Sequence, residues 1–204
     1  VVTIPMYAPE SDFTTQISMR DCQAFIDANP GALPEPQFIT FRDELTTLAE
    51  LMVKFVRSQV RKIGLSPKDC KELPLICGCH GTVIRPPAGI RDTGYKDTFE
   101  LYQRLEASLK GEFADVRIGW LNHRLGGDWT TPTAEQSAKN LLEQGYKTWI
   151  YFPFGFLADN AESLLEGRVV FRDLGVESYH HLPCINEDPD FLRFIAQIII
   201  NRLN

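Results

Sequence analysis

The sequence of 204 residues lacks both long apolar runs and clusters of basic residues. No stretch approaches the roughly 18 apolar residues that a membrane-spanning helix needs. No run of Lys or Arg exceeds two residues, and the net charge of −6 argues against the basic stripe that nucleic-acid binding requires. We therefore expect no transmembrane segment and no nucleic-acid partner. The expected location is the cytoplasm, with peripheral attachment to a membrane left open.

The five cysteines do not form the pattern of a disulfide framework. Their number is odd, and a chain of this length buries a full core without covalent staples. Cys77, Cys79 and His80 resemble a metal-ligand cluster. Alternation along a strand would turn His80 away from both thiols, and no second Cys or His pair completes a zinc site. We therefore expect reduced thiols.

The chain begins at Val1 directly in strand-like sequence. The segment that follows is rich in Pro, Asp, Ser and Thr, with one short helix expected near 16–28. From this beginning we expect residues 1–37 to continue from an N-terminal part that is missing. Residues 38–204 are expected to form a C-terminal α/β domain.

Predicted helices and strands alternate through that domain. Apolar residues recur at spacings of three and four from Phe38 to Phe55, which predicts a long amphipathic helix ended by Gly64. Short apolar runs predict strands at 73–79, 115–121, 147–153 and 178–182. Further helices are expected at 97–110, 132–145 and 158–173, and from 189 onward. Thr131 is the expected N-cap of the second of these, with Pro132 in its first turn.

The predicted strands are continuous apolar runs, and most are followed by a helix. Both features are typical of a parallel sheet that is covered on both faces. The sequence therefore predicts a three-layer α/β/α fold with a parallel, Rossmann-like sheet. Ligands of such sheets bind beyond the carboxyl ends of the strands. The loops at that edge would be 5–20, 80–96, 122–131 and 153–162.

Two features at this edge carry chemistry. His80 ends a predicted strand, and an imidazole titrates near neutrality and ligates metals. Asp159, Glu162 and Glu166 are spaced i, i+3 and i+7, which places them on one face of the expected helix. Clustered carboxylates bind hard cations or relay protons, and crowding raises their pKa. The alternatives are a structural histidine and a solvated acidic face.

Five stretches, in the same order along the chain, resemble the ferrochelatases, enzymes that insert ferrous iron into a porphyrin. The stretches are PMYAPESDFTT at 5–15, CHGT at 79–82, NHRLGGDWTTPT at 122–133, PFGFLADNAESLLE at 153–166 and LPCINEDPDF at 182–191. Together they extend over nearly the whole chain. The resemblance implies a chelatase-like fold.

The resemblance also implies a lyase-type metal chelatase that makes protoheme from protoporphyrin IX and ferrous iron. Its partners would be the porphyrin, with Tyr7 and Trp129 as substrate-binding aromatics, and a divalent metal. Iron would be a substrate, with no tightly bound cofactor. No iron–sulfur cluster is expected, because the chain ends at Asn204 without the cysteine-bearing tail of some members. The missing half would be required for the full cleft, so the isolated fragment is expected to be inactive.

The resemblance assigns a role to four residues. His80 matches the active-site histidine of the family, and Glu162 matches the glutamate opposite it. Glu166 and Asp159 match an acidic line that runs away from the site on a partly π-wound helix. All four are therefore candidate metal-binding residues, with His80 and Glu162 also catalytic. Either of these two residues remains a candidate for taking the porphyrin protons.

Three departures from the family pattern bear on activity. Asn160 stands where the family has histidine, and Val83 stands where it has proline. Gly167 interrupts the acidic helix, at a cost of about 1 kcal/mol relative to alanine. A non-catalytic tetrapyrrole- or metal-binding relative is therefore an alternative. A chelatase for another tetrapyrrole or metal is a further one.

Overall fold

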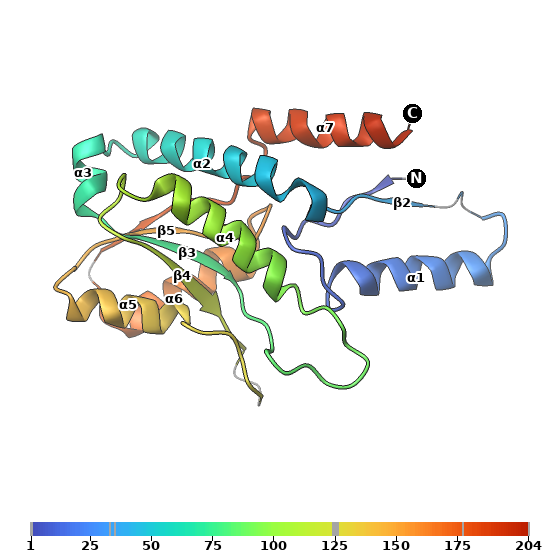
Figure 1. Ribbon diagram of the computed structural model, residues 1–204, viewed down its shortest axis with the longest axis horizontal. Helices are drawn as coiled ribbons and strands as arrows, with labels where there is room; N and C mark the ends of the chain where they lie inside the picture. The colour runs from blue at the N-terminus through green and yellow to red at the C-terminus, as the bar shows by residue number, and fades with distance from the viewer. Residues whose placement is uncertain (1, 33, 35, 124–126, 177, 204) are drawn as a thin grey trace.

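A parallel sheet of four strands organises the molecule (Figure 1). The computed structural model describes residues 2–32, 34, 36–123, 127–176 and 178–203. The strands lie in the order β4-β3-β5-β6, and every neighbouring pair is parallel. They are β3 (Leu75–His80), β4 (Val116–Leu121), β5 (Ile150–Phe152) and β6 (His180–His181).

Helices cover both faces of this sheet, which confirms the predicted three-layer α/β/α fold (Figure 1). The first face carries α2 (Leu45–Lys62) and α4 (Tyr95–Leu109), with α7 (Pro189–Leu203) beside α2. The second face carries α5 (Ala134–Glu143), the π-helical segment η2 (Glu162–Glu166) and α6 (Gly167–Asp173). The short helix α3 (Pro67–Glu72) connects α2 to β3. No helix in the described part of the chain is long and apolar enough to cross a membrane.

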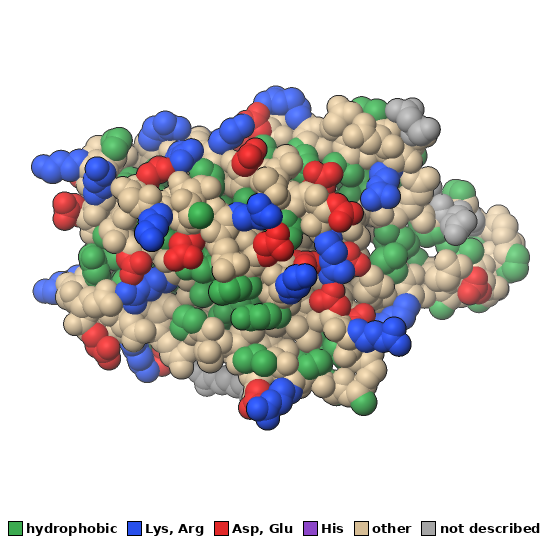
Figure 2. All heavy atoms as spheres, in the orientation of Figure 1, with side chains coloured by type: hydrophobic (Ala, Val, Ile, Leu, Met, Phe, Trp, Pro, Cys, Tyr) green, Lys and Arg blue, Asp and Glu red, His purple; other side chains and the backbone are tan. Residues whose placement is uncertain are grey.

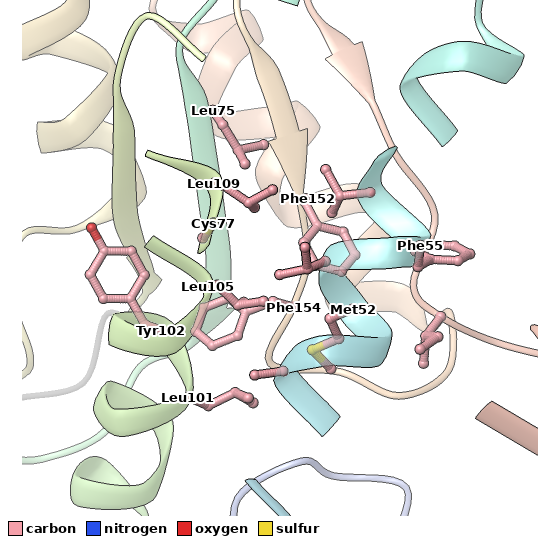
Figure 3. Close-up of a cluster of buried hydrophobic side chains, with 14 of the residues drawn as sticks. Met52, Phe55, Leu75, Cys77, Leu101, Tyr102, Leu105, Leu109, Phe152 and Phe154 are labelled. Atoms are coloured by element: carbon pink, nitrogen blue, oxygen red, sulfur yellow. The ribbon is translucent and has the colours of Figure 1, made fainter. Parts of the chain in front are cut away.

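Alternation along β3 divides the hydrophobic core in two. Leu75 and Cys77 pack with α2 and α4 on the first face, as Figure 3 shows. Ile76 packs with α5 and α6 on the second face. Side chains two residues apart in a strand point to the same face. Gly78 and His80 therefore face the same layer as Ile76, which is the layer that contains η2.

The N-terminal segment lies beside the four-stranded sheet (Figure 1). Its strand β1 (Val2–Thr3) pairs in parallel with β2 (Gln37–Phe38). The helix α1 (Thr15–Ala28) extends away from the main body, and Thr15 is its buried residue. The domain boundary between residues 37 and 38 stays a prediction.

Two predicted helix starts are wrong. Phe38 lies in β2, and α2 starts only at Leu45, after the 3-10 turn η1 (Arg42–Glu44). The strand pairing of Phe38 with Thr3 holds this residue extended, which excludes it from the helix.

The N-cap of α5 is Thr133 rather than Thr131. The Thr133 hydroxyl accepts a hydrogen bond from the backbone N–H of Gln136 at 3.1 Å. The side-chain oxygen of Gln136 accepts one from the backbone N–H of Thr133 at 2.8 Å. Such a capping box satisfies two backbone donors that would otherwise be unpaired at the helix start. The helix therefore begins at Ala134, and Pro132 lies outside it.

The surface carries charges of both signs. Figure 2 shows Lys and Arg side chains interspersed with Asp and Glu over the face in view. Ion pairs within a single helix include Lys139 with Glu135 in α5 at 2.6 Å and Arg104 with Glu100 in α4 at 2.8 Å. Exposed pairs of this kind contribute little to stability, about 0.3–0.5 kcal/mol each.

Candidate functional site

A cavity of about 510 Å³ opens where the strands of the sheet end. Its wall contains residues from all four loops that the sequence places at this edge, which are 5–20, 80–96, 122–131 and 153–162. The lining surface is mainly apolar, and it also carries several hydroxyl groups, two histidines and Glu162. Volumes of roughly 300–1,000 Å³ with such a lining are typical of small-molecule sites.

His80 and Glu162 meet in the wall of this cavity. His80 ends β3, and Glu162 begins η2. The distance from His80 Nδ1 to Glu162 Oε1 is 2.7 Å, and the two side chains are 40% and 17% exposed. When the imidazole is neutral, Nδ1–H donates to the carboxylate and Nε2 keeps its lone pair. The structure therefore brings together the two residues predicted to be catalytic.

The surroundings of His80 favour the protonated imidazole. Burial lowers the pKa of His80, but the hydrogen bond and the charge of Glu162 raise it, with a smaller contribution from the charge of Glu166. The raising effects together are the larger, so the pKa lies above its ordinary value. An imidazole in this position is a stronger base than a free one.

Glu166 lies at the far end of η2 from Glu162. Burial, followed by the charge of Glu162, raises the pKa of Glu166, while His123 and His80 oppose this rise. A carboxyl group with a raised pKa exchanges protons more readily near neutral pH. The π-helical form of η2 agrees with the partly π-wound helix that the family resemblance implies, and such segments are frequent at functional sites.

Asn160 begins the helix that carries these carboxylates. Its side-chain oxygen accepts the backbone N–H groups of Glu162 at 2.9 Å and of Ser163 at 3.0 Å. This is the task of an N-cap residue. The helix predicted from residue 158 therefore starts at Ala161, and Asn160 serves as its cap, at the position where the resemblance leads one to expect histidine.

The predicted common face of three carboxylates is wrong for Asp159. This residue precedes the helix because Asn160 caps it. The Asp159 carboxylate accepts the backbone N–H of Cys184 at 2.9 Å and the side-chain amide of Asn186 at 2.8 Å. It thereby ties the loop after β5 to the loop after β6. A metal-binding role for Asp159 stays a prediction.

The two aromatic residues predicted to bind substrate both line the cavity. Tyr7 is 43% exposed and forms an isolated antiparallel bridge with Phe156, which fixes the N-terminal segment at the cavity mouth. Trp129 forms a similar bridge with Val83. Both rings are in position to contact a flat ligand, and their binding role stays a prediction.

His123 is a site residue that the sequence does not single out. Its ring lies edge-on to that of His80, at 5.0 Å between centroids, and at 5.9 Å from Trp129. His123 also lines the cavity. A usable signal exists in the sequence, because His123 lies two residues after the predicted strand 115–121, in one of the loops expected at the ligand-binding edge. Residues 124–126 of the same loop lie outside the described residues.

The thiols near the site are buried. Cys77 and Cys79 point into the first core cluster, and burial raises the pKa of both. Burial also raises the pKa of Cys184 to about 12. Such thiols stay protonated at neutral pH, and only the thiolate ligates a metal well. Within the described residues, no group of three or more His, Cys, Asp or Glu is arranged to hold a metal ion.

Comparisons with known proteins agree on one family. A family model described as Ferrochelatase matches residues 1–203. The ferrochelatase of Rippkaea orientalis is 23% identical over 211 residues, which cover 100% of this chain and 52% of the relative. The coproporphyrin III ferrochelatase of Bacillus subtilis is 30% identical over 146 residues, which cover 67% of this chain and 45% of the relative. Ferrochelatase-1, chloroplastic/mitochondrial, of Arabidopsis thaliana is 23% identical over 214 residues, which cover 100% of this chain and 44% of the relative. The chain spans about half the length of these curated relatives.

Proposed function

The chain belongs to the ferrochelatase family, and we propose that it supplies the acid–base side of a lyase-type chelatase that inserts ferrous iron into protoporphyrin IX. The observation that carries this proposal is the hydrogen bond of 2.7 Å between His80 Nδ1 and Glu162 Oε1. It lies in the wall of a mainly apolar cavity of about 510 Å³. An apolar wall suits a macrocycle, and the polar pair suits proton transfer.

The chemistry requires a base. Insertion replaces the two pyrrole N–H protons of the free porphyrin by one ferrous ion, so two protons leave for each metal that enters. In the proposal, Nε2 of His80 accepts a proton from a pyrrole nitrogen, and the Glu162 carboxylate stabilises the imidazolium that forms. Glu166, with its raised pKa, receives protons next along η2. His80 is then free to accept the second proton.

The cavity wall offers contacts for the flat faces of the macrocycle. Tyr7, Phe13 and Trp129 contribute aromatic surface to it. Tyr7 and Phe13 are 43% and 41% exposed, which leaves ring area for a ligand to cover. We expect a second half of the ferrochelatase fold to complete this cleft. The residues described here would then form one wall of the site, and the isolated chain would show little turnover.

The test is metal insertion by this chain together with the second half of the fold that completes the cleft. Protoporphyrin IX and ferrous iron are supplied under anaerobic conditions, and metalloporphyrin formation is followed by absorbance. His80→Ala should lower kcat by about 10²-fold or more, the usual contribution of a positioned general base. The matched control is His180→Ala in β6, which should leave kcat within twofold of wild type. Insertion that is unaffected by His80→Ala would overturn the assignment of His80.

The same assay decides between substrates. A relative from Bacillus subtilis is named a coproporphyrin III ferrochelatase, so coproporphyrin III is the rival porphyrin. Zinc and cobalt are the rival metals. Comparison of kcat/KM between the two porphyrins, and among ferrous iron, zinc and cobalt, identifies the substrates that the cleft prefers.

A second candidate function is non-catalytic binding of a tetrapyrrole. One observation favours it, because Asn160 caps a helix at the position where the family has histidine. Porphyrin binding that quenches tryptophan fluorescence, without any metal insertion once the second half of the fold is present, would support this second function. Insertion by that wild-type assembly would exclude it.

A further inference from the structure

The ring of Tyr151 fills the space between the two elements that carry His80 and Glu162. Tyr151 lies in β5, is wholly buried, and packs in the second core cluster. On one side it touches Gly78, which precedes His80 by two residues on β3. On the other side it touches Gly167, which directly follows η2. One side chain thus spans from β3 to the helix that bears Glu162.

Both glycines leave room for this ring. A Cβ atom added at Gly78 would overlap Tyr151 Oη, and one added at Gly167 would lie 2.9 Å from Tyr151 Cε1 and Cζ. Gly167 has ordinary helical backbone angles, φ −57° and ψ −40°, which any residue adopts. Glycine is unfavourable in a helix relative to alanine. The missing side chain at Gly167 therefore serves the contact with the ring, since the backbone does not require it.

The ring cannot easily move to make space. Phe171 contacts it edge-on at 5.3 Å between centroids, and His181 does so at 5.0 Å. The Tyr151 hydroxyl has no hydrogen-bond partner among the residues that the structure describes. Tyr151 therefore contributes to this region through the size of its ring, because its hydroxyl group makes no hydrogen bond with the described residues.

We propose that Tyr151 and Gly167 are a matched pair of positioning residues that sets the spacing between β3 and η2. The ring holds the two elements apart, and the glycine lets η2 approach until Glu162 Oε1 reaches His80 Nδ1 at 2.7 Å. The importance of this spacing for catalysis rests on the proposed function. The spacing itself does not, and it can be measured without turnover.

The test reads the tautomer of His80 by ¹H–¹⁵N correlation from its carbon-bound ring protons, at a pH where the imidazole is neutral. The hydrogen bond that one ring nitrogen makes decides which nitrogen carries the proton. Wild type and Tyr151→Phe, which keeps the ring, should both show the Nδ1–H tautomer. Gly167→Ala pushes η2 away from the ring and should shift the population toward Nε2–H. The double variant Gly167→Ala with Tyr151→Leu restores the space and should recover Nδ1–H.

A matched control separates this effect from general loosening. An added Cβ at Gly119 in β4 would lie 3.0 Å from Ala134 and Ile76, a comparable crowding against neither Tyr151 nor Gly167. Gly119→Ala should keep the Nδ1–H tautomer. Tyr151→Leu alone removes the spacer without adding an atom and should shift the tautomer even if Gly167→Ala fails to fold.

Three results would overturn the proposal. They are a wild-type tautomer in the folded Gly167→Ala or Tyr151→Leu variant, an equal shift in Gly119→Ala, and no recovery in the double variant. None of these readouts involves metal insertion. Failure of the positioning proposal is therefore distinguishable from failure of the proposed function, which the effect of His80→Ala on kcat decides.

Discussion

The two faces of the sheet are built from alternate residues of the same strand, yet they differ in character. On the first face, β3 contributes Leu75 and Cys77 to a cluster filled by apolar side chains of α2 and α4 (Figure 3). On the second face it contributes Ile76, Gly78 and finally His80. One face of the strand contributes apolar side chains and buried thiols, and the other ends in the hydrogen-bonded pair at the cavity.

The second face also leaves polar atoms unpaired. Tyr151 Oη and Trp149 Nε1 are buried without hydrogen-bond partners among the described residues. Unpaired buried groups of this kind cost about 1–3 kcal/mol each. Proteins tolerate such departures from good packing mainly near functional sites. The first face is filled by apolar side chains, whereas the second combines a smaller apolar cluster with unpaired polar atoms and the His80–Glu162 pair.

The largest expected effect is on the first face. Leu105 in α4 is wholly buried, so Leu105→Ala should lower the free energy of unfolding by about 2–5 kcal/mol, the usual cost of a cavity in a core. Urea unfolding measures this loss. Gln103→Ala, on the exposed side of the same helix, is the control and should stay within about 0.5 kcal/mol of wild type. A loss in Leu105→Ala no larger than that of the control would contradict the assigned role of this face.

Two tyrosines offer the sharpest comparison of the faces. On the first face, Tyr102 Oη donates to the carbonyl of Val116 at 3.1 Å, and Tyr102→Phe should cost about 1 kcal/mol because it leaves that carbonyl unpaired. On the second face, Tyr151→Phe removes an unpaired hydroxyl and should be neutral or stabilising by up to about 1 kcal/mol. Urea unfolding of both variants checks the opposite signs. Equal losses would mean that the hydroxyl of Tyr151 has a partner in solution.

The sequence predicts well those structural features that depend on residues close together in the chain. Apolar strands alternating with helices predict the parallel sheet, and the end of a strand predicts the position of His80. The pairing of His80 with Glu162 follows from strand-end geometry together with the family resemblance, and the structure brings the two atoms to 2.7 Å.

The features that the sequence misses depend on contacts between distant segments. The spacing of Asp159 fits a helix face, but its carboxylate is bound by Cys184 and Asn186, which follow 25 and 27 residues later. In the sequence, Gly167 is an unfavourable residue inside a predicted helix. The structure explains it by the buried ring of Tyr151, which leaves no room for a side chain at this position. A helix periodicity carries no information about either partner, because neither lies within a few turns of the residue concerned.

The pair on the second face should contribute a pH-dependent stability. A histidine whose pKa is raised in the folded state stabilises the fold below its unfolded pKa, near 6.5, and this contribution is lost as the pH rises through the folded pKa. Glu162→Gln should therefore be less stable than wild type at pH 5.5 and nearly equal to it at pH 8.5. Because the His80 side chain is 40% exposed, solvent screening limits the difference to about 0.5–1 kcal/mol.

Urea unfolding at the two pH values measures this difference. Glu143→Gln removes an exposed carboxylate from α5 and serves as the control, with no change expected between the two pH values. A deficit of Glu162→Gln that stays constant with pH would argue for lost packing and against a charge effect on His80.

The smallest expected effect is the change in the free energy of unfolding of Glu166→Gln. This change is a gain, whereas that of Glu162→Gln is a loss. Burial and the charge of Glu162 raise the pKa of Glu166, so the folded state favours its protonated form. Ionisation of such a group destabilises the fold above the folded pKa, and the cost is absent below the unfolded pKa, near 4.5. Although part of the Glu166 side chain is buried, most of the residue is exposed to solvent, so Glu166→Gln should gain only about 0.2–0.5 kcal/mol at pH 7 and nothing at pH 4. A gain of equal size at both pH values in urea unfolding would show that side-chain packing, and not the crowding of two carboxylates on η2, is responsible.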